Sequence, residues 1–195
     1  MIIETCEESG SFDLPPYLEE LTDQLGNPDM VVVMDSGGPD YDHVWMTEAL
    51  RGLVSGTLSV KVSHEGIHSG NSGGSIPSSF RIQRILLDRV EDSATGRVLI
   101  PEMHADIPQE VRDKAVALRD IVGNSIWEQF PTVDSLRQAS ESTEDMIVAM
   151  NWEPTLSIIG ADGMPSVQVA GNVLRTNTDL KLSFRIPPGV DSEAA

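Results

Sequence analysis

The feature that most constrains the fold is an uninterrupted apolar run at residues 30–34, which reads Met-Val-Val-Val-Met. Turn-forming residues bound it on both sides, Gly-Asn-Pro at 26–28 and Ser-Gly-Gly-Pro at 36–39. A β-branched run without polar alternation is typical of a strand buried on both faces, as in a parallel sheet. Residues 15–25 fit a short helix between this strand and an apolar one at the N-terminus, so the first region is predicted to be a βαβ unit.

The pattern changes near Arg51, where a second region begins. Apolar and polar side chains alternate over residues 54–62, which is the period of a half-buried strand. Further strands are predicted at 155–159 and 179–186, and helices after the capping serines 78 and 79, from Pro108 to Gly123, and over 133–150. We therefore expect an α/β chain with a partial parallel-sheet domain at 1–50 and a two-layer α+β domain at 51–195.

The charge of the chain excludes several classes of partner. Its 31 Asp and Glu against 13 Lys and Arg give a net charge of −18, which argues against nucleic acid and anionic membranes. Cys6 is the single cysteine, so an internal disulfide is excluded and a cytoplasmic location is predicted. The chain opens in an apolar stretch and closes on residues 190–195, which read as the first turn of a helix. We therefore expect a piece of a longer protein.

Three features could carry chemistry, and each has a simpler interpretation. Glu7 and Glu8 follow the predicted N-terminal strand, where an extended backbone would send them to opposite sides; they could equally be a solvated surface pair. Asp35 ends the run at 30–34, at the sheet edge where α/β proteins bind ligands, or it caps a turn. His68 lies in a glycine-rich loop and could donate to an oxyanion, or it could be an exposed histidine without a role.

Taken in order along the chain, these residues resemble the central part of the dinuclear zinc exopeptidase family. That family includes carnosine dipeptidase, bacterial dipeptidases, aminoacylase and succinyl-diaminopimelate desuccinylase. The matching segments are Glu7-Glu8-Ser9-Gly10-Ser11, Asp35, Arg51-Gly52, Ile67-His68-Ser69-Gly70, Gly171-Asn172-Val173 and Ser183-Phe184-Arg185. The resemblance covers essentially the whole chain and is strongest with the dipeptidase branch.

The resemblance implies a metal-dependent hydrolase of dipeptides or related small amides. Glu7 would be the general base that takes a proton from a water bridging two metal ions. Glu8 would bind one metal ion and Asp35 the other. The two ions would be zinc, with manganese or cobalt as alternatives, because carboxylate and imidazole ligands discriminate poorly among them.

The second region would be the lid or dimerisation domain of such an enzyme and would form a homodimer. His68 would reach the active site of the partner subunit and stabilise the tetrahedral oxyanion. Asn172 would also contact the substrate across the dimer. Arg185 would bind the terminal carboxylate of a small peptide or N-acyl amino acid, or it could be a surface arginine paired with an acid.

The sequence also departs from the family. The family's upstream His-x-Asp and downstream His are not found in place, and His104-Ala105-Asp106 follows the Glu pair, so we interpret it as a coincidence. One carboxylate for each zinc is too few, because a catalytic zinc normally has three protein ligands. We therefore expect this chain alone to be inactive.

Two other functions stay open from the sequence. The chain could be a non-catalytic dimerisation or binding module, whose edge strand pairs with that of a second copy. It could also be an acidic cation-binding protein, although the sequence has no Asp-x-Asp-x-Asp-Gly calcium loop.

Overall fold

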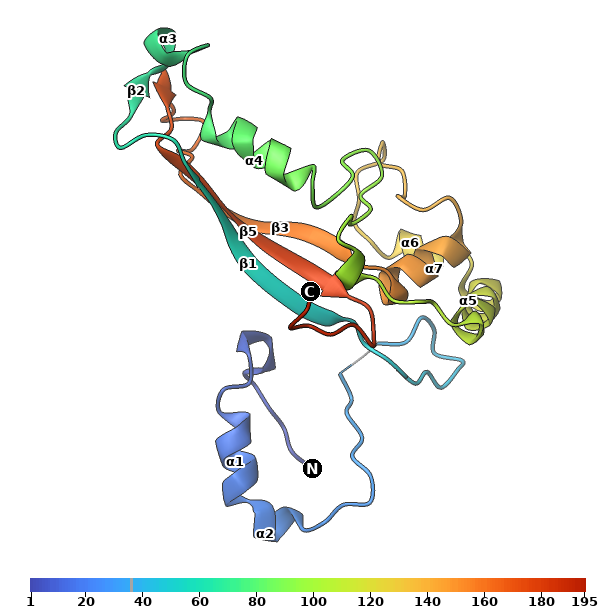
Figure 1. Cartoon of the computed structure of the whole chain (residues 1–195). Coiled ribbons are helices and arrows are strands. Elements are labelled where there is room, and N and C mark those ends of the chain that lie inside the picture. Colours follow the sequence, from blue (N-terminus) through green and yellow to red (C-terminus); the bar gives the residue numbers. More distant parts are fainter. Residues whose placement is uncertain (36) are drawn as a thin grey trace. The chain divides into compact units, whose positions relative to one another are not determined.

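A computed structural model describes residues 1–35 and 37–195, which form two compact units (Figure 1). Unit 1 spans Met1–Gly37 and unit 2 spans Gly38–Ala195. The division between the units precedes residues 38–50, which have no regular secondary structure. The predicted domains, 1–50 and 51–195, stay a prediction, since a compact unit need not coincide with a functional domain.

Unit 1 is built from three short helical segments. They are the 3₁₀ turn η1 (Glu7–Ser9), α1 (Leu14–Glu20) and α2 (Thr22–Leu25). The helix predicted over 15–25 is confirmed, with a break at Leu21. None of the described residues of unit 1 is buried, so this unit lacks a core of its own.

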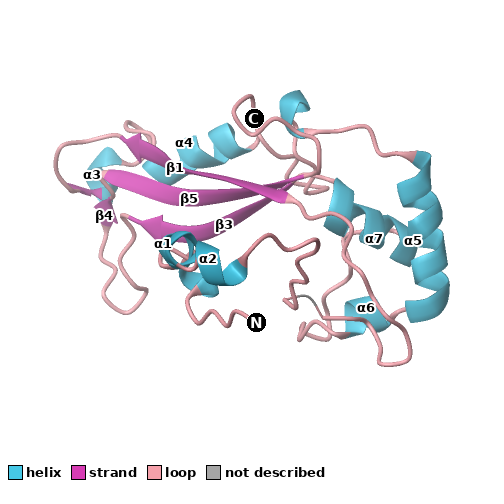
Figure 2. Cartoon of the chain, turned by 90° about the horizontal axis from the view of Figure 1, so that it is seen from below, coloured by secondary structure: helices cyan, strands magenta, loops and turns pink. Residues whose placement is uncertain are grey.

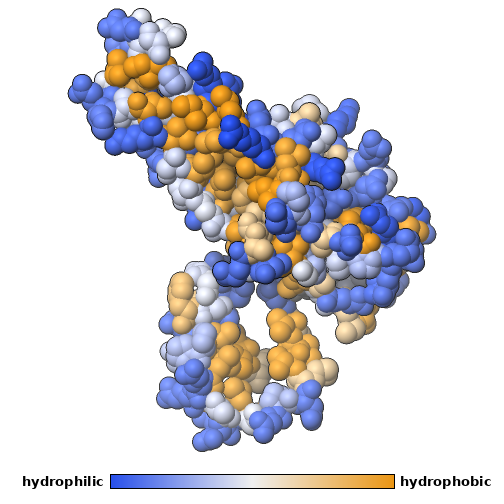
Figure 3. Space-filling view, in the orientation of Figure 1, coloured by the Kyte–Doolittle hydropathy of each residue, from blue (hydrophilic) through white to orange (hydrophobic). Residues whose placement is uncertain are grey.

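The predicted βαβ unit is wrong for the described residues. Residues 1–5 and 30–34 lie outside any strand, and Met30 and Met34 expose 78% and 91% of their surface. The exposed run contributes to the apolar surface of unit 1 (Figure 3). A strand buried on both faces needs neighbouring strands to pair with and layers that cover it, and the described part of unit 1 contains no other strand.

Unit 2 is organised around a three-stranded antiparallel sheet in the order β1-β5-β3 (Figure 2). Its strands are β1 (Gly52–Lys61), β3 (Thr155–Asp162) and β5 (Asn177–Ile186). All three correspond to strands predicted from the sequence, β1 and β5 of them from alternation. On the central strand, Phe184 and Ile186 are buried whereas Lys181 and Arg185 are exposed, as the period of two requires.

The helix α4 (Ser79–Leu87) packs against β1 and β5, so the predicted two-layer arrangement is present. It begins where the sequence predicts, because the Ser78 hydroxyl accepts a hydrogen bond from the backbone N–H of Arg81. Gln83 is fully buried under this helix, and its Nε2 donates to the carbonyl oxygens of Leu58 and Thr178 at 3.0 and 2.6 Å. One side chain thus ties α4 to both strands.

We expect Gln83→Ala to lower the free energy of unfolding by about 3 kcal/mol, because the buried carbonyl group of Thr178 and the part-buried one of Leu58 lose a donor and a cavity opens. Urea unfolding followed by circular dichroism measures the change. Gln168→Ala, at an exposed position, is the control and should shift stability by less than about 0.5 kcal/mol. Coincident unfolding curves for the two variants would contradict this role of Gln83.

Further helical segments follow α4 along the chain, and Met103 in the first of them packs against Phe184 and Ile186 of the sheet. These segments are η2 (Pro101–Met103), α5 (Gln109–Val122), α6 (Ser125–Glu128) and α7 (Thr143–Trp152). The helix predicted between Pro108 and Gly123 is confirmed, and α5 packs on α7 through Ala115, Ile147 and Val148. The helix predicted over 133–150 begins ten residues later, because the Ser142 hydroxyl caps it by accepting from the N–H of Asp145.

A small two-stranded sheet extends from the end of the main sheet. It consists of β2 (Ile67–His68) and β4 (Val173–Leu174), with the single turn α3 (Ser69–Ser72) following β2. No helix in the described residues is long and apolar enough to cross a membrane.

Candidate active site

Asp35 and Glu8, two of the predicted acidic residues of unit 1, lie within electrostatic reach of the third, Glu7. Glu7 and Glu8 occupy the 3₁₀ turn η1, which corrects the extended backbone predicted for them. Their side chains still diverge, because successive residues of a 3₁₀ helix are rotated by about 120°. The negative charge of Asp35, and next that of Glu8, raises the pKa of Glu7 above its usual value. The charges of Asp35 and Glu8 therefore both act on the exposed carboxylate of Glu7.

His68 lies at the junction of β2 and α3, and its ring is oriented by the backbone. Its Nδ1 accepts a hydrogen bond from the N–H of Gly70 at 3.1 Å. A neutral imidazole that accepts at Nδ1 carries its hydrogen on Nε2. The exposed Nε2 of His68 is thus available as a donor to an oxygen outside this loop.

Glycines make this arrangement possible. A Cβ on Gly70 would lie 3.1 Å from both Nδ1 and Cε1 of the His68 ring, and one on Gly66 would lie 2.8 Å from Val173. A Cβ on Gly73 would meet the carbonyl oxygen of Ser69 at 2.8 Å. The dense glycines noted in the sequence are therefore explained by close approach of the backbone and of the His68 ring.

Asn172 lies beside His68. The strand register pairs His68 with Val173, and the N–H of Ser69 donates to the carbonyl oxygen of Asn172 at 2.9 Å. Both predicted residues are exposed at the same tip of unit 2.

Arg185 lies far from that tip. It pairs with Leu53 near the start of β1, whereas Asn177 pairs with Lys61 at the other end of the same sheet (Figure 1). The eight residue-to-residue steps from Asn177 to Arg185 span about 26 Å at roughly 3.3 Å per step. A dipeptide is only about 7 Å long, so His68 and Arg185 of one chain cannot contact the same dipeptide.

Arg51 is a residue that the sequence analysis used only as the opening of a strand. Its Nη1 donates to the carbonyl oxygen of Glu153 at 3.3 Å and to Thr155 Oγ1 at 3.2 Å. Burial, and then the positive charge of Arg185, lowers its pKa. The alternation of side chains along the strand could have identified Arg51. Residues two apart point to the same face, so Arg51 shares a face with Leu53, and Leu53 pairs with Arg185.

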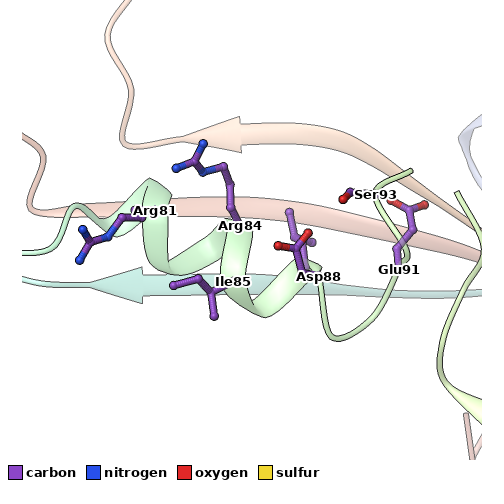
Figure 4. Close-up of a pocket in the computed structure, with 7 residues that line it drawn as sticks. Arg81, Arg84, Ile85, Asp88, Glu91 and Ser93 are labelled. Atoms are coloured by element: carbon purple, nitrogen blue, oxygen red, sulfur yellow. The ribbon is translucent and has the colours of Figure 1, made fainter. Parts of the chain in front are cut away.

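A hollow beside α4 in unit 2 is separate from these residues. About 460 Å³ in volume, it follows α4, and its lining includes Arg81, Arg84, Asp88 and Glu91 (Figure 4). None of the predicted site residues lines it. His104, from the His-x-Asp match, uses its Nε2 in a 2.8 Å hydrogen bond with the Val98 carbonyl oxygen, which fits the interpretation of that match as a coincidence.

Three solved structures share this fold. The yeast dipeptidase Dug1p superposes with a TM-score of 0.69 at 24% identity, covering 97% of this chain and 40% of that one. Human carnosine dipeptidase 1 gives 0.65 at 22% identity, covering 96% and 39%. The M20 family metallo-carboxypeptidase Sso-CP2 of Sulfolobus solfataricus gives 0.63 at 20% identity, covering 94% and 47%.

Curated proteins of similar sequence are dipeptidases. The chain is 27% identical over 191 residues to the Cys-Gly metallodipeptidase DUG1 of Saccharomyces cerevisiae, covering 97% of this chain and 39% of that protein. It is 24% identical over 189 residues to the Beta-Ala-His dipeptidase of Mus musculus, covering 96% and 38%. No family model matches. The predicted resemblance to the dipeptidase branch of these metal-dependent exopeptidases is thus confirmed, and the chain spans about two fifths of the length of the relatives it matches.

The acidic residues are of the right chemical type to bind a divalent metal ion, but they provide too few ligands for a complete site. Carboxylate oxygens are ordinary ligands of catalytic zinc, which normally has three protein ligands. Among residues 1–35 and 37–195, no group of three or more His, Cys, Asp or Glu side chains is arranged to hold a metal ion. The described residues therefore do not form a metal centre by themselves.

Proposed function

We propose that this chain is part of a metal-dependent dipeptidase that hydrolyses the amide bond of small peptides or N-acyl amino acids. The observation that carries the proposal is the similarity to metallodipeptidases over 97% of the chain. The grouping of Glu7 with Asp35 and Glu8 supports it, because hydrolysis requires a base close to the ligands of the electrophilic centre. Residues 1–50 would be part of a parallel-sheet catalytic domain, and 51–195 its lid or dimerisation domain.

Glu7 would accept a proton from the attacking water, and Arg185 would bind the carboxylate of the substrate. Glu8 and Asp35 would each give one ligand to a pair of divalent ions, zinc before manganese or cobalt, and the other ligands would come from outside this chain. The single Cys6 favours the cytoplasm as the location.

A homodimer follows from the distance between the two parts of the site. Because one chain cannot bring its own His68 and Arg185 to one dipeptide, His68 and Asn172 would act on the substrate held by the partner subunit. Helix α4 offers a self-complementary surface for such a dimer, with Arg81 and Arg84 in the helix and Asp88 and Glu91 after it. Two antiparallel copies would pair opposite charges across a twofold axis near Ile85.

The complete gene product is the material for the test, with a panel of dipeptides as substrates. We expect hydrolysis that a chelator abolishes and added zinc restores, and no hydrolysis by residues 1–195 alone. Chelator-resistant activity would contradict metal dependence. Hydrolysis by the isolated chain with stoichiometric zinc would contradict the assignment of the missing ligands to other segments, and the chain would then be a complete enzyme. A stable dimer without peptidase activity would favour the binding module.

A further inference from the structure

Two arginines share the face of the main sheet opposite α4. Arg185 of β5 pairs with Leu53 on one side and with Thr155 on the other. Paired residues of an antiparallel sheet point to the same face, and Arg51, two residues before Leu53, returns to that face. Arg51, Arg185 and Thr155 therefore belong to one surface that crosses all three strands.

The Arg51 side chain reaches across the central strand. Its backbone adjoins β1, while its Nη1 hydrogen bonds with Thr155 Oγ1 at the start of β3. Because β5 lies between these two strands, the guanidinium of Arg51 must pass beside Arg185. Its second acceptor, the Glu153 carbonyl oxygen, is also uncharged.

Both guanidinium groups keep donors that the described residues do not use. In the Arg51 side chain, only Nη1 has a hydrogen-bond partner among the described residues. The side chain of Arg185 has neither a hydrogen bond nor an ion pair there. A guanidinium has five N–H donors, so each can still take a carboxylate.

Within the described residues, no acidic side chain pairs with either of these two arginines. Elsewhere in unit 2, Arg119 pairs with Asp120 and Glu144, and Lys114 pairs with Glu48 and Glu110. At the Arg51–Arg185 pair, in contrast, like charges lie together, and neutral oxygens hold one of them in place. An anion from outside the described residues would relieve their repulsion.

We propose that Arg51 and Arg185 form one binding site for a dicarboxylate, in which each guanidinium takes one carboxylate. If the proposed dipeptidase function holds, the ligand is a peptide whose C-terminal residue is Asp or Glu. Arg185 then binds the α-carboxylate, and Arg51 is the residue that selects for the acidic side chain.

The test is a titration of the 195-residue chain with glutarate and with pentanoate, which have the same number of carbons and differ by one carboxylate. Arginine Nε–H signals in ¹⁵N NMR spectra report the binding. We expect glutarate to bind about fivefold more tightly than pentanoate, the size typical of one exposed charge pair, and the advantage to shrink with added salt.

Three variants assign the effect. Arg51→Gln should remove the preference for glutarate and leave pentanoate binding unchanged, whereas Arg185→Gln should weaken both. Thr155→Val keeps both charges but removes an anchor of Arg51, so it should reduce the preference without affecting pentanoate. Arg137→Gln, the same charge change at an exposed position, should match the unmodified chain.

Equal affinity for the two acids, or a glutarate preference that survives Arg51→Gln in a variant with an unchanged circular dichroism spectrum, would overturn the proposal. The measurement involves no catalysis. A complete protein without peptidase activity would therefore refute the proposed function and leave this binding result standing.

Discussion

Glu7→Gln in the complete gene product should lower kcat by two to four orders of magnitude with the bound metal retained. Glutamine keeps the size of the side chain but cannot accept a proton, and a positioned general base contributes about 10²–10⁴-fold. Steady-state kinetics on a dipeptide, with metal analysis of the same sample, measures both quantities. The neighbouring carboxylates of Asp35 and Glu8 raise the pKa of Glu7, which strengthens it as a base.

Glu19→Gln is the matched control for this variant, since it makes the same change on the exposed surface of α1. Its kinetics should equal those of the unmodified protein. If Glu7→Gln lost activity and metal together, Glu7 would be a ligand; if it kept normal turnover, the base would be another residue.

The second large effect is expected for His68→Ala, which should reduce kcat by about 10²–10³-fold, the loss typical of one oxyanion donor. The structure makes the more discriminating experiment a mixture of two inactive variants. Because the length of β5 from Asn177 to Arg185, about 26 Å, separates Arg185 from the tip that carries His68, we expect His68 to act in the partner's site, and a heterodimer of His68→Ala and Glu7→Gln then holds one intact site. Random reassembly of equal amounts should restore about one quarter of the activity.

His64→Ala is the control, since His64 is an exposed histidine four residues before His68. This variant should leave turnover unchanged, without being mixed with a second variant. Failure of the mixture to recover activity, with dimers present on a sizing column, would show that His68 does not act across the dimer.

The sequence predicted the parts of the fold that depend on local pattern. Alternation located β1 and β5, because a sheet with one covered face must bury every second residue. Ser78 located α4, because its hydroxyl satisfies a free N–H in the first turn. The helix predicted over 133–150 was too long, because the segment before Ser142 is not helical and the Ser142 hydroxyl caps the first turn of α7.

The candidate site was predictable only in part. The glycines around His68 indicated a crowded loop, but the hydrogen bond from Gly70 that orients the ring required coordinates. Arg51 was overlooked because its partners Glu153 and Thr155 lie about a hundred residues away in sequence. The prediction of a strand at 30–34 is wrong for a related reason. A strand needs neighbouring strands to pair with, and the sequence of the run does not determine whether they are present.

The exposed run at 30–34 also affects how the purified polypeptide behaves. An uncharged segment of high β-propensity without proline can pair with its copies in other molecules and start aggregation. Self-association through this segment would grow with concentration and without a fixed stoichiometry, unlike a closed twofold dimer. Replacing Val32 with lysine would suppress this aggregation and leave a twofold dimer intact. This variant is therefore the appropriate starting material for measuring the oligomeric state.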